Sequence, residues 1–176
     1  MARDARWGRV HETYGEDPYL VAALGVAFTR GMQGKDLREG VLASAKHFIG
    51  YAVTDAGQNM AATAVGPREL YEVYARPFEA AIRLAGLGSV MASYAEFEGV
   101  PIHVSHEVLT NLLRQRMGFS GTVVSDYVGV GWAQTRQCVA DTPEETATTT
   151  QPRGPFAGDV QHPESNHRFE RQSLKP

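Results

Sequence analysis

The sequence predicts an α/β fold built on a parallel sheet. Through roughly the first 140 residues, short apolar runs typical of buried strands alternate with segments typical of helices. Each apolar run ends in polar side chains, and the composition changes abruptly near Asp141. Strands that alternate with helices pair in parallel through right-handed crossovers. With 176 residues, 43% of them hydrophobic, the chain is long enough for one domain with a core.

The first helix is expected to begin at Pro18, because Asp17 is a favourable N-cap residue and proline suits the first turn. This helix ends within Gly31–Gly34. The first strand is the apolar run 41–48, which closes on the polar pair Lys46-His47.

Two helical segments follow a polar loop. Pro67 opens the first, over residues 68–75, and Pro77 separates it from the second, over residues 78–85. Gly86 ends the second segment. Two helices in succession therefore precede the next strand.

The second strand covers residues 89–94 and is followed by a turn at Gly99–Pro101. A helix is expected over 105–117, capped by its first residue and ended by Gly118. The last strand covers residues 121–126. All the expected strands thus alternate with helical segments.

Polar side chains close these strands: Lys46 and His47, then Tyr94, then Asp126. In a (β/α) barrel the carboxyl ends of the strands form the active face, and a doubly wound sheet also binds ligands there. A full barrel typically needs about 250 residues, so this chain offers only about half of one. Periodicity alone supports a parallel α/β domain with a polar cluster at one rim.

The chain divides into a folded part, residues 1–140, and a tail, residues 141–176. Between Thr142 and the C-terminus the bulky apolar residues are too few to offset the entropy of ordering; they are Phe156, Val160, Phe169 and Leu174. We therefore expect a disordered or unrelated C-terminal tail.

Composition excludes several classes of function. The net charge is −3 with a pI near 6.1, and no basic stripe suits a phosphate backbone, so nucleic acid is not an expected partner. The single Cys138 excludes an internal disulfide framework. No signal-like or membrane-spanning apolar run occurs, so we expect no membrane partner and a cytoplasmic location.

Asp126 is the first candidate for chemistry. It follows an apolar strand at the rim, where a carboxylate is costly unless it is paired, hydrogen-bonded or functional. One interpretation is an N-cap for the segment after Tyr127. The other is a nucleophile or base kept ionised by nearby cations.

Lys46, His47 and Arg9 are the candidate cations and donors. Each has an ordinary alternative: His47 as a structural histidine, Lys46 as a solvated lysine, and Arg9 as the partner of Glu12 or Asp17. Arg9 lies beside Trp7, and this combination suits the hydroxyls and apolar face of a sugar.

No cofactor is expected. His103 and His106 lack a third ligand of evident geometry, so no metal site is predicted and a capping role is preferred. Gly129-Val-Gly131 lacks the length and context of a dinucleotide loop, and no phosphate-binding loop or serine-hydrolase elbow occurs.

Taken together, these segments resemble glycoside hydrolase family three, particularly its β-glucosidase and β-xylosidase branch. No single motif suffices, but several match in the right order between Met1 and about Gly131. They are Arg6-Trp-Gly-Arg9, Glu12-Thr-Tyr-Gly-Glu-Asp-Pro-Tyr-Leu20, Lys46-His-Phe48, Gly66-Pro-Arg-Glu-Leu70, Pro77-Phe-Glu-Ala-Ala81, Ser89-Val-Met-Ala-Ser-Tyr94 and Gly118-Phe-Ser-Gly-Thr-Val-Val-Ser-Asp-Tyr127.

The resemblance implies an incomplete TIM-type (β/α) barrel in which Asp126 attacks the anomeric carbon of a glycoside. It further implies that Tyr127 flanks the leaving-group subsite, while the terminal sugar lies against Arg9, Lys46, His47, Met91 and Tyr94. The N-acetylglucosaminidase branch usually continues Pro-Gly-His-Gly after Lys-His-Phe, whereas this chain has Ile49-Gly50-Tyr51, which argues against an amino sugar.

The family also has parts without a counterpart here: early barrel strands with another sugar-binding carboxylate, the rest of the barrel, and a second domain that supplies the acid/base Glu. We therefore expect a retaining exo-acting β-glycosidase, acting on an oligosaccharide or glycoside, present as a fragment without its general acid. Glu96 and Glu98 are expected to be structural or solvent-facing. The alternative is a non-catalytic fragment that at most binds sugar weakly.

Overall fold

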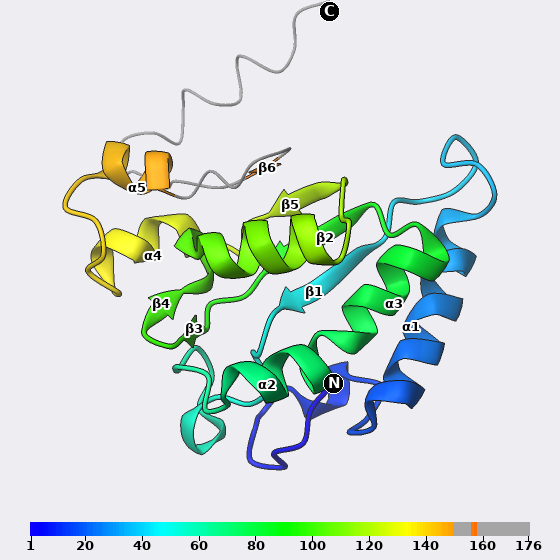
Figure 1. Ribbon diagram of the computed structural model, residues 1–176, viewed down its shortest axis with the longest axis horizontal. Helices are drawn as coiled ribbons and strands as arrows, with labels where there is room; N and C mark the ends of the chain where they lie inside the picture. Colours follow the sequence, from blue (N-terminus) through cyan, green and yellow to red (C-terminus); the bar gives the residue numbers. More distant parts are fainter. Residues whose placement is uncertain (150–155, 158–176) are drawn as a thin grey trace, which may run out of the picture.

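The structure, a computed structural model, describes residues 1–149 and 156–157. Its centre is a parallel four-stranded sheet in the order β1-β2-β5-β6 (Figure 1). The strands are β1 (Ser44–Phe48), β2 (Ser89–Ala92), β5 (Thr122–Val124) and β6 (Phe156–Ala157). The predicted parallel α/β fold is confirmed.

Two helices cover the sheet beside β1, namely α1 (Pro18–Gln33) and α3 (Arg76–Ala85), which lie side by side (Figure 1). Two shorter segments lead into α3: α2 (Pro67–Glu69) and the π-helical turn η3 (Leu70–Tyr74). The π-helix η5 (Glu107–Arg116) lies in front of β2 and β5 in Figure 1.

The remaining described elements are short. They are η1 (Val10–Glu12), η2 (Asp55–Gly57), η4 (Ile102–Val104), α4 (Gly129–Thr135), α5 (Pro143–Thr149) and the antiparallel pair β3 (Glu96–Phe97) and β4 (Val100–Pro101). No described helix is both long and apolar enough to cross a bilayer.

The helix signals in the sequence act as expected. The Asp17 carboxylate accepts a 2.7 Å hydrogen bond from the Leu20 N–H, which caps α1. Gly86 takes a left-handed conformation, with φ of 61°, at the end of α3. The Ser105 hydroxyl accepts from the Val108 N–H at 3.2 Å, as predicted for the start of the third long helix.

The core lies between the sheet and the helical segments η3, α3 and η5. Its fully buried members include apolar side chains from the sheet, η3 and η5, and α3 contributes Ala81. Examples are Phe48, Leu70, Val90, Val108, Leu109, Leu113 and Val123. Burying these faces supplies the main favourable free energy of folding.

Several predicted boundaries were wrong. The first strand begins at Ser44 rather than at residue 41, because the Val41 N–H bonds to the Met32 carbonyl and its side chain is exposed. The second and last strands stop at Ala92 and Val124, two residues short of the predicted ends. Their rim residues therefore lie in loops.

The prediction that the chain after Asp141 lacks regular structure is wrong over Pro143–Thr149, which form α5, and at Phe156–Ala157, which extend the sheet beside β5. The Thr142 hydroxyl accepts from the Glu145 N–H at 3.1 Å at the start of α5, and Thr146 is buried. The rest of the predicted tail lies outside the described residues.

Candidate active site

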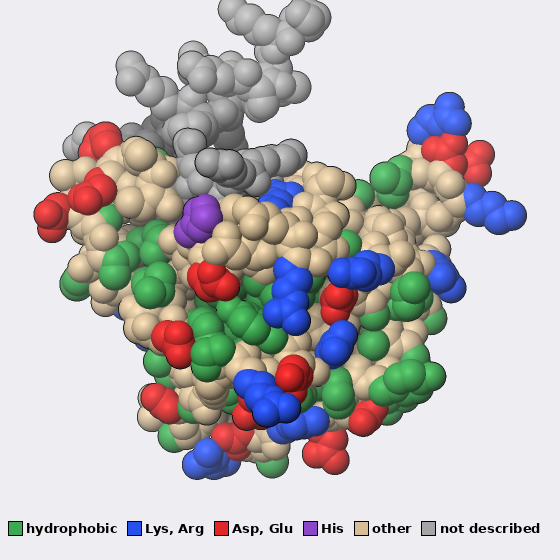
Figure 2. Space-filling model, in the orientation of Figure 1, with side chains coloured by type: hydrophobic (Ala, Val, Ile, Leu, Met, Phe, Trp, Pro, Cys, Tyr) green, Lys and Arg blue, Asp and Glu red, His purple; other side chains and the backbone are tan. Residues whose placement is uncertain are grey.

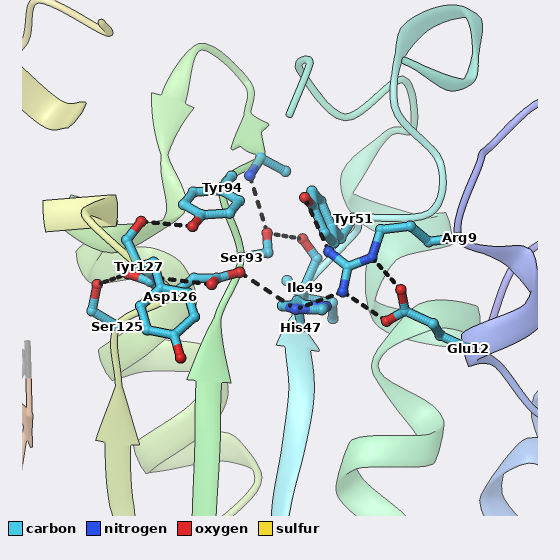
Figure 3. Close-up of polar contacts among 11 residues, drawn as sticks. Arg9, Glu12, His47, Ile49, Tyr51, Ser93, Tyr94, Ser125, Asp126 and Tyr127 are labelled. Carbon is cyan, nitrogen blue, oxygen red and sulfur yellow. Dashed lines mark hydrogen bonds and ion pairs between the residues drawn. The ribbon is translucent and has the colours of Figure 1, made fainter. Parts of the chain in front are cut away.

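Three of the predicted rim residues, His47, Tyr94 and Asp126, meet where β1, β2 and β5 end (Figure 3). His47 lies in β1, Tyr94 two residues beyond β2, and Asp126 two residues beyond β5. Arg9, from the N-terminal loop, completes the group. Parallel strands bring their carboxyl ends to one edge, so residues distant in sequence become neighbours here.

Asp126 is buried, with an exposed fraction of 7%. Its Oδ2 lies 3.4 Å from His47 Nε2, and its Oδ1 accepts a 2.8 Å hydrogen bond from the Tyr127 N–H. The helix that follows begins at Gly129 and has no side-chain cap. Asp126 is therefore not the N-cap that one interpretation of the sequence proposed.

Arg9 forms the ion pair with Glu12 that its sequence context allowed, and it also reaches the rim residues. Its Nε and Nη2 donate to the two oxygens of Glu12, each at 2.6 Å. The same Nη2 lies 3.5 Å from His47 Nε2, and Nη1 donates to the Tyr51 hydroxyl at 3.4 Å. The ion pair with Glu12 is therefore compatible with a position of the guanidinium at the rim, next to His47 and Tyr51.

The charged groups of the site shift one another's pKa values. Hydrogen bonding to Arg9 lowers the pKa of Glu12 to about 2, and the bond to Glu12 raises the pKa of Arg9. Burial lowers the pKa of His47 to about 4, with the Arg9 and Lys46 charges acting in the same direction and Asp126 opposing them. His47 is consequently a neutral imidazole near pH 7.

An aromatic cluster surrounds these polar groups. The Tyr51 ring makes edge contacts with Trp7, His47 and Tyr94, at centroid distances of 5.6, 4.8 and 6.0 Å. The Tyr94 ring also lies 4.4 Å from Trp132. Burial, followed by the nearby charge of Asp126, raises the pKa of Tyr94. The cluster therefore forms an aromatic wall beside the polar groups.

The other three predicted binding residues are Lys46, Met91 and Tyr127, and the structure gives none of them a side-chain bond to Asp126. Lys46 is exposed and lines, with His47 and Tyr51, a mainly apolar cavity of about 240 Å³ between β1 and α1, which Asp126 does not line. Met91 is half-buried within β2. Tyr127 is 81% exposed, although its carbonyl accepts a 2.6 Å hydrogen bond from the Tyr94 hydroxyl.

The remaining candidates from the sequence have other surroundings. His103 is buried beneath Tyr94, with ring centroids 6.2 Å apart, and His106 is exposed. The capping role preferred for the two histidines is wrong at the start of η5, where the Ser105 hydroxyl is the cap and His106 makes no side-chain cap bond.

Glu98 is exposed at the β3–β4 turn and Glu96 is half-buried in β3. Among the described residues, no three His, Cys, Asp or Glu side chains gather as a metal site would require.

Comparison with known proteins identifies the family of this chain. The sequence profile described as the glycosyl hydrolase family 3 N terminal domain matches residues 1–150. This chain belongs to that family. Its fold is accordingly part of the family's TIM-type (β/α) barrel.

Similar family members include a β-xylosidase of Formosa agariphila, which is 46% identical over 150 residues, covering 83% of this chain and 21% of the relative. A lysosomal β-glucosidase of Dictyostelium discoideum is 35% identical over 128 residues, covering 69% and 16%. The chain therefore spans about a fifth of the length of these relatives.

Solved structures agree with the sequence matches. The β-glucosidase from Listeria innocua in complex with isofagomine superposes with a TM-score of 0.86 at 33% identity, over 92% of this chain and 23% of that protein. The β-glucosidase EmGH1 from Erythrobacter marinus gives 0.83 at 36% identity, over 89% and 22%.

Sequence reasoning did not assign site roles to Tyr51, Trp132 or Glu12. Tyr51 and Trp132 are lone aromatics in segments without periodicity, and Glu12 was considered only as an alternative partner for Arg9. The spacing of Arg9 and Glu12 in one short helical turn, three residues apart, was the available signal for that pair.

Proposed function

We propose that this family 3 chain is part of a retaining, exo-acting β-glycosidase in which Asp126 is the nucleophile. The observation that supports this most directly is the buried Asp126 carboxylate, which faces the neutral His47 imidazole at 3.4 Å at the rim of a parallel sheet. Beyond His47 lies the Arg9 guanidinium.

The chemistry follows from this arrangement. The Asp126 carboxylate attacks the anomeric carbon, and the leaving oxygen departs as an alcohol after it takes a proton from a general acid. The glycosyl ester that forms on Asp126 is then hydrolysed by water. Positive charge develops on the sugar ring in the transition state, and a carboxylate beneath it stabilises that charge. Donors on Arg9 and His47 are available to hold sugar hydroxyls through this change.

For the substrate we propose a terminal β-linked glucose or xylose on an oligosaccharide or glycoside. The similar family members are named as β-xylosidases and β-glucosidases, and the loop after Lys-His-Phe departs from the amino-sugar branch. This chain's own rim offers hydroxyl partners in Arg9 and His47.

Mass spectrometry tests the nucleophile. Incubation with 2-deoxy-2-fluoroglucosyl fluoride, or its xylosyl counterpart, should give a covalent adduct on Asp126, because fluoride leaves without needing a proton. Asp126→Asn should abolish the adduct. Asp141→Asn is the control and should leave it intact, because the Asp141 carboxylate is exposed and this residue bonds to Glu145 and Gln134 through its own backbone N–H and carbonyl. An adduct on another residue would refute the assignment.

The second candidate function is sugar binding without turnover. A retaining enzyme needs a second carboxyl group about 5–5.5 Å from the nucleophile to protonate the leaving oxygen. The side chains that bond to Asp126 are those of His47 and Tyr94, and neither is a carboxylic acid. Saturable glucose or xylose binding by NMR, with no adduct from either fluoride, would favour this candidate over the first.

A further inference from the structure

His103 is a buried polar side chain that the proposed mechanism does not use. Figure 2 shows charged and hydrophobic side chains interspersed over one face of the molecule, whereas His103 lies inside it with an exposed fraction of 1%. Its Nε2 has no hydrogen-bond partner among the residues that the structure describes. A buried nitrogen without a partner costs free energy, which indicates that this position serves something other than stability.

The ring of His103 lies against Gly129, the first residue of α4. A Cβ atom added at Gly129 would lie 2.4 Å from Nε2 and 2.5 Å from Cε1 of this ring, which is closer than real Cβ atoms approach. Only a glycine therefore lets the backbone come this near to the imidazole. Burial lowers the pKa of His103 to about 4, so the ring is neutral near pH 7 and its effect on Gly129 is steric.

Gly129 belongs to the turn that carries the proposed nucleophile. The Gly129 N–H donates a 3.0 Å hydrogen bond to the Asp126 carbonyl, which closes the turn. Within the turn Val128 has a left-handed conformation, with φ of 51°, which is unfavourable for a β-branched residue. The Tyr94 hydroxyl donates to the Tyr127 carbonyl at 2.6 Å (Figure 3). A turn in this conformation needs support from the residues packed around it.

We propose that His103 is a positioning residue for Asp126: its ring supports Gly129 and thereby sets where the turn places the carboxylate. This inference rests on the proposed function, in which Asp126 is the nucleophile. The surrounding packing supports it, because the Tyr94 ring lies next to both the His103 ring and the Trp132 ring of α4, at centroid distances of 6.2 and 4.4 Å. η4 and α4 also pack against each other. His103 therefore acts on Asp126 through the backbone of the turn.

Inactivation kinetics with 2-deoxy-2-fluoroglucosyl fluoride test the contact in the full chain. Gly129→Ala should lower the maximal rate of adduct formation on Asp126 about 100-fold, because a nucleophile displaced by about 1 Å reacts far more slowly. The fluoride concentration that gives half of the maximal rate should change less than about threefold, since Arg9 and His47 stay in place. Gly131→Ala, in the same helix with open space around it, is the matched control and should react like the unaltered chain.

A second substitution at His103 tests whether its ring is the cause. His103→Ala alone leaves the turn unsupported and should slow adduct formation about tenfold. Combined with Gly129→Ala it should restore the reaction to that same rate, about tenfold faster than Gly129→Ala alone, because the smaller side chain leaves room for the added methyl group. Slowing of the double variant by about 1000-fold, the product of the two separate effects, would overturn the proposal.

The Tyr127 amide gives an NMR readout that does not depend on turnover, because this N–H donates to Asp126 Oδ1 at 2.8 Å. His103→Ala should shift the amide proton signal upfield in the free chain, since the carboxylate moves away from its donor. Leu87→Val, at a buried site just before the opposite end of β2, is the control for a general loss of stability and should leave the signal unchanged. An unaltered Tyr127 signal in His103→Ala would overturn the positioning role even if adducts form. A shifted signal in a chain that forms no adduct would support the positioning role and count against the proposed function alone.

Discussion

At the scale of single residues, the site depends on an ion pair that holds a cation in place. Glu12 binds Arg9 through two 2.6 Å charge-assisted bonds, which leaves Nη1 toward Tyr51 and Nη2 toward His47. Glu12 is linked to Asp126 through Arg9 and His47. Its proposed role is therefore to position Arg9.

Glu12→Gln should slow adduct formation on Asp126 roughly 10- to 100-fold, because small misplacement of a binding group has effects of that size. The Arg9 Nε–H signal in the NMR spectrum of the free chain should also lose its protection from exchange. Glu16→Gln is the control and should change neither quantity. An unchanged Arg9 signal in Glu12→Gln would show that other contacts hold the guanidinium.

Which residues meet at the rim was partly predictable from the sequence. Strand-closing polar residues indicated His47, Tyr94 and Asp126, since parallel strands end at one edge. Tyr51 was not predictable, because its contacts with Trp7 and Tyr94 join segments far apart in sequence. The proposed roles of Lys46, Met91 and Tyr127 in binding stay predictions.

At the scale of secondary structure, glycine and proline positions made the longer elements predictable. Pro18, Gly86 and Gly118 mark boundaries that the structure confirms to within two residues. Elements of two to seven residues, such as the β3–β4 pair and α4, are too short to show periodicity. These short elements form because of strand pairing and burial in the folded chain, which the local sequence does not show.

One glycine pair determines how closely β2 and β5 approach. A Cβ atom added at Gly121 would overlap the Gly88 carbonyl, which accepts a 3.0 Å hydrogen bond from the Thr122 N–H. Gly121→Ala should therefore destabilise the chain by about 1–3 kcal/mol in urea unfolding, the usual cost of overpacking. Gly131→Ala, in α4 with open space around it, is the control and should be neutral or slightly stabilising. Equal stability of the two variants would contradict this close approach.

At the scale of the whole molecule, the fold is a section of a barrel with an open edge. β1 pairs with β2 on one side, and the cavity of about 240 Å³ lies between β1 and α1. The sequence indicated about half a barrel through its length alone. It did not reveal that α1 lies beside this cavity, because strand periodicity carries no information about which helix lies at the edge.

Two buried histidines couple the stability of the whole molecule to pH. Burial lowers the pKa of His103 to about 4, and that of His47 also lies near 4. The unfolded chain protonates first, as the pH falls through about 6.5, so stability declines between about pH 6.5 and pH 4 and these groups add no further loss below that.

The shift at His103 corresponds to about 2–3 kcal/mol of lost stability by pH 4.5. His103→Gln should reduce the fall in the urea-unfolding free energy between pH 7 and pH 4.5 by that amount, whatever its effect at pH 7. The exposed His106→Gln is the matched control and should follow the original curve, since carboxylates titrating in this range are common to both variants. If His103→Gln lost as much stability as the unaltered chain, His103 would not be held neutral by the core.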